Sequence, residues 1–381
     1  MTLKLTKEDS MKVVCDRNTL AEAIDLVSNI ALTRAPNPML TCVHITACDG
    51  QLVLAATDGE AWLSVMLSNV AVERHGVLAI PAANLRNVVA GEKEDPTLTL
   101  SGEGGDLLVS GFDARFRVCG YSANDYPALP EFPASQVQMK QPAASLAKLL
   151  ANTMFATGKE NSRYSINGVF IAQKGKRLEV VGTDGRRLAI SNADASGKDV
   201  SFILPNKAAT LVRKIVAKHT EDVEVATTDN MLFFRMGTPD RPGCIILAAN
   251  KAEGTFPPYG DLVKTGTDKR VTVDRQKFIS AMRRAAILTN EESRGVRMQF
   301  AKGKPATFTG RAPEVGEGVV QLEIQSYDGE PIEIGFNPSL IWEGLGAVAD
   351  EVVSFEMNAP SKPGVMRADR FLYLVMPITL T

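Results

Sequence analysis

The tripeptide Thr57-Asp58-Gly59 occurs a second time as Thr183-Asp184-Gly185, at an offset of 126 residues in a chain of 381. Two further pairs of segments recur at almost the same offset: Thr19-Leu20-Ala21 with Ser145-Leu146-Ala147, and Ile80-Pro81 with Leu204-Pro205. Self-similarity at a fixed period is the signature of a repeat architecture, in which copies of one unit build a larger shape. Because the offset is about a third of the length, the sequence predicts three repeats.

The pattern of apolar residues within each repeat predicts the order β-α-β-β-β, used twice. Helical spacing of apolar residues marks one helix in each half, whereas alternation marks the strands. Hairpin turn signals such as Asp49-Gly50 and Asp58-Gly59 join the strands, so the sheets are expected to be antiparallel. With two helices covering part of the sheets of each repeat, the fold class is α+β. The six helices are predicted over residues 19–31, 81–91, 145–157, 205–219, 275–289 and 338–349.

Two segments rich in proline and aromatic residues separate the repeats. They run from Tyr126 to Pro133 and from Phe256 to Tyr259, and clustered prolines mark connecting loops. The third repeat is the most divergent, because a loop from Arg311 to Gly318 is expected to replace the Thr-Asp-Gly turn. The predicted boundaries are an N-terminal extension at 1–10 and domains at 11–133, 134–262 and 263–381.

The composition argues against several classes of protein. No apolar run approaches the ~20 residues needed to cross a bilayer, and the N-terminus lacks the apolar core of a signal peptide, so a cytoplasmic protein is expected. The chain has five cysteines, none of them in a C-x-x-C spacing, and three histidines that are far apart. These residues argue against a disulfide framework, a zinc site and a Ser-His-Asp triad. His44 lies in a strand-like run, where a half-buried structural histidine is the favoured interpretation. No metal and no cofactor are predicted.

Basic residues gather in the predicted helices, although the net charge of the whole chain is −2. The six helices contain ten basic and three acidic residues, so the strands and loops are correspondingly acidic. One basic helix would be an ordinary solvated surface, but a bias over six equivalent helices predicts a positive surface. Such a surface suits a polyanion that is held through its phosphates without any reading of bases.

Specific motifs accompany the repeat pattern. In chain order they are Arg163-Tyr164-Ser165-Ile166-Asn167-Gly168, Thr183-Asp184-Gly185-Arg186-Arg187-Leu188-Ala189, Phe256-Pro257-Pro258-Tyr259, Arg284-Ala285-Ala286-Ile287-Leu288, Arg294-Gly295-Val296-Arg297, Ile334-Gly335-Phe336-Asn337 and Leu374-Val375-Met376-Pro377-Ile378. Each motif is weak alone. In this order and at this spacing, the chain resembles the bacterial sliding clamps, the beta subunit of DNA polymerase III. The resemblance covers residues 11 to about 380.

The resemblance implies three DNA-clamp domains in each chain, with antiparallel sheets outside and two helices per domain lining the inside of a ring. A head-to-tail homodimer would close this ring around duplex DNA and slide along it, because phosphate contacts are non-specific. The implied partners are the DNA polymerase III alpha subunit, the clamp loader complex, and other polymerases and repair proteins that carry a clamp-binding peptide. Such a processivity factor performs no covalent chemistry, so the protein is not expected to be an enzyme.

The resemblance also implies a pocket for partner peptides between the second and third repeats. Its apolar members would hold an aromatic or leucine anchor, and Met376 can adapt to several ligands. Ile166 and Leu188, taken alone, also fit ordinary core positions. Asp261 stands where family members often carry a basic residue, which would alter the polarity of the pocket edge. The residues carried over to the pocket are Ile166, Thr183, Gly185, Arg187, Leu188, Pro257, Leu262, Tyr327, Val375, Met376 and Pro377.

Contacts to DNA and between subunits are expected at further positions. For the subunit interface, the resemblance implies that Phe116 and Val118 on an edge strand of one chain meet Ile287 and Leu288 of the other. Pairing two edge strands would satisfy the hydrogen-bonding groups of both. For DNA, the resemblance and the charge of the helices together indicate Arg34, Arg163, Tyr164, Lys214, Lys218, Arg283, Arg284 and Arg294.

Two other functions are compatible with parts of the sequence. Asp58 and Asp184 could act as paired carboxylates in a hydrolase, but both fall in hairpin turns of separate repeats and are better explained as turn formers. A clamp-like paralogue without a replication role would share the fold and lack the peptide site. Binding of a peptide with a Gln-x-x-Leu-Phe anchor, weakened by Met376→Ala, would distinguish a true clamp from such a paralogue.

Overall fold

The computed structural model describes residues 11–159, 167–238, 243–264, 266–289 and 295–379. The chain divides into two compact bodies: the first holds the residues up to Ala143 together with Ile215–Lys251, and the second holds Ala144–Lys214 and the residues from Ala252 onwards. The division passes through the second repeat, so each body contains one boundary between repeats.

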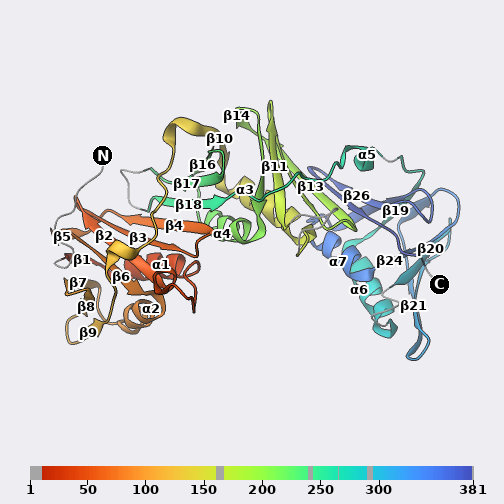
Figure 1. The fold of residues 1–381 in the computed structure, drawn as a ribbon. Coiled ribbons are helices and arrows are strands. Elements are labelled where there is room, and N and C mark those ends of the chain that lie inside the picture. The colour runs from red at the N-terminus through yellow and green to blue at the C-terminus, as the bar shows by residue number, and fades with distance from the viewer. Residues whose placement is uncertain (1–10, 160–166, 239–242, 265, 290–294, 380–381) are drawn as a thin grey trace. The chain divides into compact units, whose positions relative to one another are not determined.

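Two antiparallel sheets form the first body, which Figure 1 draws from red through orange to yellow, with β16 to β18 in green. One sheet has the order β5 (Ala71–Arg74), β1 (Lys12–Asp16), β7 (Thr97–Glu103), β8 (Asp106–Ser110), β9 (Arg115–Val118). The other runs through β10 (Val137–Pro142), β16 (Asp222–Thr227), β17 (Met231–Met236), β18 (Ile245–Asn250), β4 (Ala61–Leu67), β3 (Gln51–Thr57), β2 (Cys42–Cys48) and β6 (Gly76–Pro81). Because β4 pairs with β18 in register, Leu63 opposite Leu247, one sheet crosses the boundary between the first and second repeats.

The helices of the first body are α1 (Arg17–Val27) and α2 (Ala82–Gly91), which pack against each other, and α1 also contacts β3 and β4. Helix α1 begins two residues earlier than predicted, because the Asp16 carboxylate caps it by accepting a hydrogen bond from the Thr19 N–H (2.8 Å). The helix ends at Val27, before the predicted end. The apolar face expected from the 3.6-residue spacing is confirmed, since its members are buried: Leu20, Ala23, Ile24 and Val27.

Two antiparallel sheets also form the second body. The larger has the order β15 (Val200–Pro205), β11 (Gly168–Lys174), β12 (Arg177–Thr183), β13 (Arg187–Asp194), β27 (Phe371–Val375), β26 (Gly364–Ala368), β25 (Val352–Met357), β19 (Lys269–Asp274), β23 (Ser326–Asp328). The smaller has the order β22 (Gly316–Leu322), β21 (Ala306–Ala312), β20 (Val296–Phe300), β24 (Ile332–Phe336). The pairing of β13 with β27 again carries one sheet across a boundary, here between the second and third repeats.

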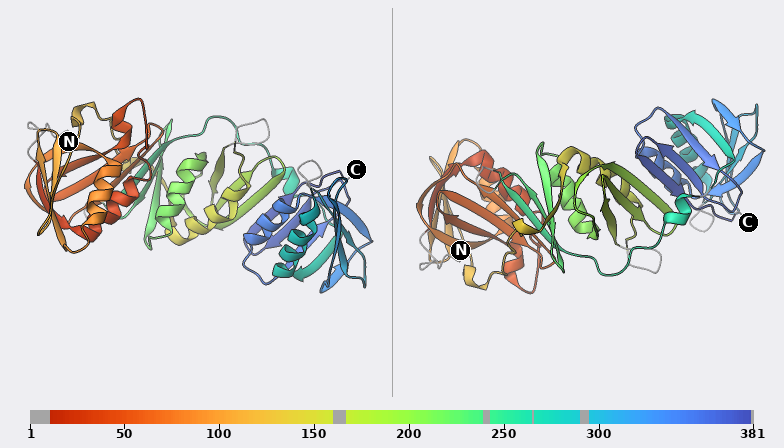
Figure 2. Two further views of the ribbon diagram at one scale, coloured as in Figure 1. Left: turned by 90° about the horizontal axis from the view of Figure 1, so that it is seen from below. Right: turned by 90° about the horizontal axis from the view of Figure 1, so that it is seen from above.

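Five helices belong to the second and third repeats: α3 (Ala143–Thr153), α4 (Asn206–Val216), α5 (Gly260–Val263), α6 (Arg275–Ala285) and α7 (Pro338–Gly346). Figure 2 shows α6 and α7 side by side, and the two helices contact each other. All six predicted helices are confirmed. Helix α5 was not predicted, because a single turn is too short to show a helical pattern of apolar residues.

A glycine lets a helix end lie directly against a strand in both the second and the third repeat. A Cβ atom on Gly182 would lie 2.2 Å from the carbonyl oxygen of Thr153, the last residue of α3. A Cβ atom on Gly310 would lie 1.9 Å from the carbonyl oxygen of Ala285, the last residue of α6. Both approaches are too short for any side chain, so the two repeats depend on the same contact at equivalent positions.

The prediction that a loop occupies Arg311 to Gly318 is wrong. Strands β21 and β22 continue through this segment, with Gly310 paired to Gly318 and Ala312 paired to Gly316. Gly316 has a φ of 132°, a value that glycine adopts easily and other residues avoid. The third repeat therefore keeps a hairpin where the other two have the Thr-Asp-Gly turn. Strand β21 extends into the segment predicted as a loop, and β22 begins within it.

Both copies of the Thr-Asp-Gly segment form the same turn. The Thr57 hydroxyl accepts a hydrogen bond from the Gly59 N–H at 3.0 Å, and the Thr183 hydroxyl accepts one from the Gly185 N–H at 3.2 Å. In each copy the aspartate Oδ1 accepts hydrogen bonds from the two backbone N–H groups that follow the glycine, at 2.8 to 3.0 Å. These bonds are those of turn-forming carboxylates, so they favour the turn interpretation over a catalytic pair.

Candidate functional site

An apolar cluster lies on one face of the sheet where β13 and β27 join the second repeat to the third. Leu188 pairs with Leu374, and Ile190 pairs with Leu372, across these two strands. Since side chains alternate between the two faces of a strand, these four point to the same face. The buried members of the junction cluster, as we call it, are Val181, Leu188, Ile190, Ile203, Phe256, Val365 and Leu374.

The connector between the second and third repeats covers this cluster with aromatic rings. The ring of Phe256 stacks on that of Phe170 with centroids 5.0 Å apart, and Tyr259 meets both rings edge-on. Pro257 is half-buried, whereas the Leu262 side chain in α5 is 41% exposed. Tyr259 and Val263 thus extend the apolar cluster towards α5, where Leu262 is an exposed apolar side chain.

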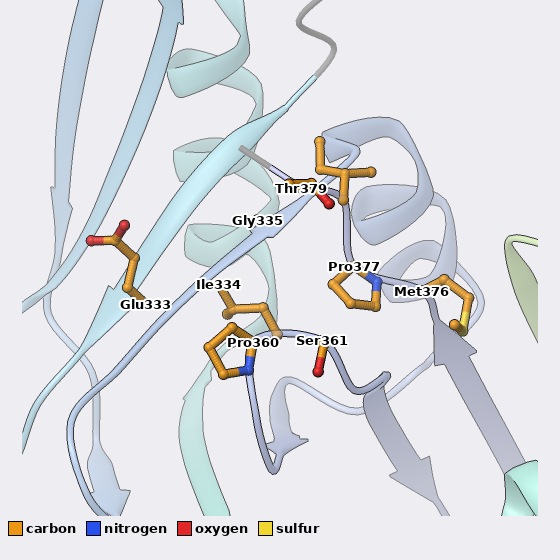
Figure 3. Close-up of a pocket in the computed structure, with 9 residues that line it drawn as sticks. Glu333, Ile334, Gly335, Pro360, Ser361, Met376, Pro377 and Thr379 are labelled. Carbon is orange, nitrogen blue, oxygen red and sulfur yellow. The ribbon is translucent and has the colours of Figure 1, made fainter. Parts of the chain in front are cut away.

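A hollow of about 430 Å³ opens beside the end of β27 (Figure 3). Met376 and Pro377 line it from the C-terminal segment, and Pro360 and Ser361 line it from the loop between β25 and β26. The segment is fixed in place because the Ile378 N–H donates a hydrogen bond to the Gly335 carbonyl oxygen (2.9 Å). Met376 also packs against the junction cluster, so the hollow and the cluster form one continuous surface.

Two residues carried over to the pocket lie elsewhere in the structure. Val375 is fully buried in the main core of the third repeat, together with Phe355, because neighbouring residues of a strand face opposite ways. Leu374 takes the place that had been assigned to Val375. Tyr327 is 4% exposed and stacks on Phe300 (6.0 Å between centroids) inside the same core. We therefore replace both residues by Leu374 in the proposed site.

Arg187 belongs to the opposite face of the sheet from Leu188. Its side chain is only 10% exposed, and its Nε donates a hydrogen bond to the Asp184 carboxylate at 2.9 Å. Its Nη1 forms an ion pair with the Glu343 carboxylate of α7, and its guanidinium lies 5.4 Å from the centre of the Phe155 ring. Arg187 thus supports the site from behind, by holding the turn of the second repeat to a helix of the third.

The remaining pocket residues shape the end of the same hairpin. Thr183 is buried, and its hydroxyl donates to the carbonyl oxygen of Arg187 at 2.7 Å. Gly185 has a φ of 83°, which the turn requires and which other residues rarely adopt. Ile166 lies outside the described residues. Sequence reasoning missed Leu374 and Phe256 as members of this surface. Residues 371 to 376 are all apolar, so no alternation in the sequence marks a face of β27.

The basic residues assigned to DNA are exposed wherever the structure describes them. Lys214 lies in the last turn of α4, and Arg283 and Arg284 lie in the last turn of α6. Arg34 is exposed in the segment after α1, and Lys218 is exposed just beyond α4. A cation in a last helical turn also stabilises the helix through its dipole, so these residues have a structural role as well. Three others lie outside the described residues: Arg163, Tyr164 and Arg294.

The residues assigned to the subunit interface lie near edge strands. Strand β9 is the last strand of its sheet, and Phe116 on it is 38% exposed. Val118 is 5% exposed because its own sheet and neighbouring elements cover it, so it offers little surface to a partner. Strand β22 is likewise the last of its sheet, and the neighbouring Ile287 is 71% exposed, whereas Leu288 is half-buried. Further exposed apolar residues lie near these two strands and were not predicted: Phe112 in the turn before β9, Val315 in the turn before β22, and Val319 on β22.

His44 has the structural role that the sequence indicated. Its ring lies 4.8 Å from the ring of Tyr126, and its Nδ1 is 3.3 Å from the Thr46 hydroxyl. Burial lowers the pKa of His44 to about 4, since the protonated ring cannot be solvated there. The imidazole is therefore neutral near pH 7 and helps to fix the first connector.

One group of three acidic side chains stands close together in the described part of the chain. The carboxylates of Glu92, Asp95 and Asp113 lie within 4.8 Å of one another. Asp95 already accepts a hydrogen bond from the Phe112 N–H (2.8 Å), and partial burial with a hydrogen bond to Asp95 raises the pKa of Glu92. Because these groups anchor the hairpin between β8 and β9, they give no specific reason to expect a metal ion.

Models of the three domains of the DNA polymerase III beta subunit match consecutive parts of the chain. The model of the N-terminal domain matches residues 11–130, that of the central domain residues 140–257, and that of the C-terminal domain residues 262–379. None of the helices in the described part of the chain has the length and apolar character that crossing a membrane requires.

Similar proteins and structures extend over nearly the whole chain. A beta sliding clamp from Pseudomonas aeruginosa is 30% identical and covers 97% of this chain and 100% of that protein. One from Chlamydia muridarum is 29% identical, with 97% and 99% covered. The crystal structure of the DNA polymerase III subunit beta from Pseudomonas aeruginosa matches with a TM-score of 0.90 at 28% identity, covering 97% and 100%. A sliding clamp from Bacillus subtilis shares the fold with a TM-score of 0.90 at 20% identity, covering 98% and 100%.

Proposed function

The chain belongs to the family of DNA polymerase III beta subunits, the beta sliding clamps, and from this premise we propose how its repeats and surfaces act on DNA. It is a DNA sliding clamp, a non-catalytic processivity factor of replication. The observation that carries this function is the ordered series of three domain matches, over residues 11–130, 140–257 and 262–379. We place it in the cytoplasm, where replication takes place in bacteria.

We propose that two copies form a closed ring, head to tail. In this arrangement β9 of one copy pairs with β22 of the other, and Phe116 packs near Ile287. Each of these strands ends its own sheet and presents exposed apolar residues, which is a surface that favours pairing with another edge strand. This is a head-to-tail contact between two different surfaces. Repeating such a contact gives a closed ring when the rotation from one copy to the next adds up to a full turn. Sedimentation analysis should give a dimer at micromolar concentration.

Retention on DNA then depends on the closed ring and not on affinity. The basic residues on α4 and α6 contact phosphates without reading bases, so the ring can move along the duplex. Clamps loaded onto a nicked circular plasmid should remain bound during gel filtration and should be lost once the plasmid is linearised. Equal loss from circular and linear DNA would contradict the ring.

We propose that the junction cluster and the hollow beside Met376 together bind the anchor peptides of partners. These partners include the DNA polymerase III alpha subunit, the clamp loader complex, and other polymerases and repair proteins. The proposal is supported by the position of Met376, which packs against the junction cluster and also lines the hollow. A related clamp from Pseudomonas aeruginosa also binds a ligand, griselimycin. A flexible thioether such as Met376 can fit several anchors.

A fluorescent peptide with a Gln-x-x-Leu-Phe anchor tests this site. Met376→Ala should weaken its binding about tenfold, because a buried Met side chain contributes about 1.5 kcal/mol or more to apolar contact. Val352→Ala changes an exposed apolar residue that lines neither the hollow nor the junction cluster, so it is the control and should bind normally. Equal affinity of all three proteins would place the peptide elsewhere.

A further inference from the structure

A second hollow, of about 440 Å³, lies beside α5 on the same face of the sheet as the junction cluster. Ile190 and Leu372 line it, and these two residues pair across β13 and β27 next to the pair Leu188 and Leu374. A strand rises about 3.3 Å per residue, so Ile190, which belongs both to the cluster and to the lining of the hollow, lies about 7 Å along β13 from Leu188. Tyr259 and Val263 contact the cluster and also line the hollow, so the two surfaces are continuous.

The acidic group on the floor of this hollow already has partners. One oxygen of the Glu179 carboxylate accepts a hydrogen bond from Arg177 at 2.9 Å, and the other accepts one from the Tyr259 hydroxyl at 2.7 Å. Burial and the neighbouring Glu179 carboxylate raise the pKa of Tyr259, so its hydroxyl stays protonated and continues to donate. The negative charge of Glu179 is therefore compensated within the protein.

Basic side chains dominate the rim. Lys264 is 80% exposed, Arg177 is 61% exposed and Arg367 is 42% exposed. Lys264 has only a loose ion pair with Asp261 (3.7 Å), which is itself fully exposed, and the Nε of Arg367 reaches Glu356 at 3.3 Å. Asp369 is the other acidic residue that lines the hollow. Because Arg177 offsets Glu179, the other charged residues of the lining are Lys264 and Arg367 against Asp369, which is a net charge of +1. Asp261 and Glu356, the partners of these two cations, lie outside the lining.

We propose that this hollow binds acidic residues that flank the hydrophobic anchor of a partner peptide. The proposal rests on the proposed peptide site, and it assigns a second, charge-selective part to that site. Two observations carry it: the hollow is continuous with the apolar surface for the anchor, and the residues that line it include three cations and two carboxylates. A flank of two to four residues reaches it from the anchor, since an extended chain spans about 3.3 Å per residue.

Peptides that share the Gln-x-x-Leu-Phe anchor and differ only in their flanks test the proposal. One peptide has serine and glycine flanks, one has four acidic residues before the anchor, and one has them after it. One of the two acidic peptides should bind about three- to tenfold more tightly than the neutral one at low salt, as expected from two or three exposed charge contacts. The preference should diminish at high ionic strength, because exposed charges are screened.

The matched variants are Lys264→Glu and Lys302→Glu. Both lysines are exposed, and Lys302 lies in the turn between β20 and β21, so it serves as the control for a change in net charge. Lys264→Glu should abolish the preference for the acidic flank and should favour a peptide with a lysine flank. A simple loss of structure would not reverse the preference in this way. Lys302→Glu should retain the original preference.

Each result decides between distinct conclusions. If the neutral peptide itself fails to bind, the proposed peptide site is wrong, and the flank proposal fails with it. If the neutral peptide binds normally, but neither acidic flank improves binding, the hollow does not recognise acidic residues. If Lys264→Glu and Lys302→Glu reduce the preference equally, the effect comes from the overall charge of the protein and the hollow has no specific role.

Discussion

The Arg187 guanidinium forms an ion pair with the Glu343 carboxylate, which ties the end of the second repeat's hairpin to α7 of the third repeat. Arg187 is almost buried, whereas the Glu343 side chain is 41% exposed. A charge removed from water must be paired, so Arg187 depends on Glu343 more than Glu343 depends on Arg187. The pair lies on the face of the sheet opposite Leu188. Loss of the pair should therefore also affect the packing of Leu188 on the other face.

Replacing Glu343 by Gln should therefore reduce the stability of the second body by about 1 kcal/mol, a value below that of a fully buried pair because Glu343 is partly solvated. Urea unfolding followed by tryptophan fluorescence measures the change, since Trp342 is the neighbouring residue. Glu333→Gln breaks an ion pair with Arg297 in which both side chains are over 40% exposed, and it should have little effect. Equal effects of the two substitutions would show that Arg187 does not need Glu343.

Gly310→Ala should destabilise the third repeat severely. The new methyl group would lie 1.9 Å from the Ala285 carbonyl oxygen, so the end of α6 would have to move away from β21. We expect a loss of about 2–4 kcal/mol in the free energy of unfolding, typical of overpacking against backbone. Gly346→Ala, with open space at the corresponding position, should be neutral or slightly stabilising. Thermal unfolding of the two variants makes the comparison, and a normal melting temperature for Gly310→Ala would contradict the observed contact.

The stability of the first body should depend on pH through His44. Its pKa is about 4 in the folded state and about 6.5 in the unfolded state, so the unfolded chain binds the extra proton between these values. Stability should fall as the pH drops from about 6.5 to about 4, by up to about 3 kcal/mol, and this contribution should be constant above pH 7. Urea midpoints measured for the native protein and for His44→Gln provide the test. The decline should be smaller in the variant, and identical declines would mean that other groups cause it.

Ile287→Asp should convert the dimer to monomers without unfolding the chain. The side chain is 71% exposed, so the charge adds little strain within one subunit, but it would be buried without a partner in the proposed interface. Sedimentation velocity should show a dissociation constant raised by at least about a hundredfold, corresponding to about 3 kcal/mol. Val352→Asp changes another exposed apolar residue, 43% exposed on β25, and should leave the dimer intact. A dimer unaffected by Ile287→Asp would locate the interface elsewhere.

The repeat pattern and the helices could be predicted from the sequence because both rest on local spacing. The Thr-Asp-Gly turns recur at a fixed offset, and Leu20 and Ile24 mark a helical face by themselves. Strand faces are harder, since a shift of one residue moves every side chain to the other face. The resemblance carried Val375 over to the pocket, whereas the register of β27 against β13 puts Leu374, and not Val375, on the same face as Leu188. Only the pairing of strands that are far apart in the sequence settles such a choice.

Some features of the site had no local signal at all. The ion pair between Arg187 and Glu343 joins residues 156 positions apart, and the sequence around either residue gives no indication of the other. The hollow beside α5 arises because a one-turn helix lies next to paired strands from two repeats. Exposure also depends on distant neighbours: Phe116 and Val118 share a strand, yet only Phe116 remains accessible.

The sheets that cross the repeat boundaries should determine what happens when a protease cleaves a connector between repeats. At each boundary, backbone hydrogen bonds between strands, β4 with β18 and β13 with β27, hold together the segments that the connectors link covalently. A protease that nicks the connector at Pro258 should therefore yield two fragments on a denaturing gel but one particle in solution. Expressing a single repeat alone would instead leave β18 or β27 without its neighbour, as an exposed edge prone to aggregation. Fragments of this protein are best made by cleaving the folded chain, and a repeat is not a unit that can be isolated.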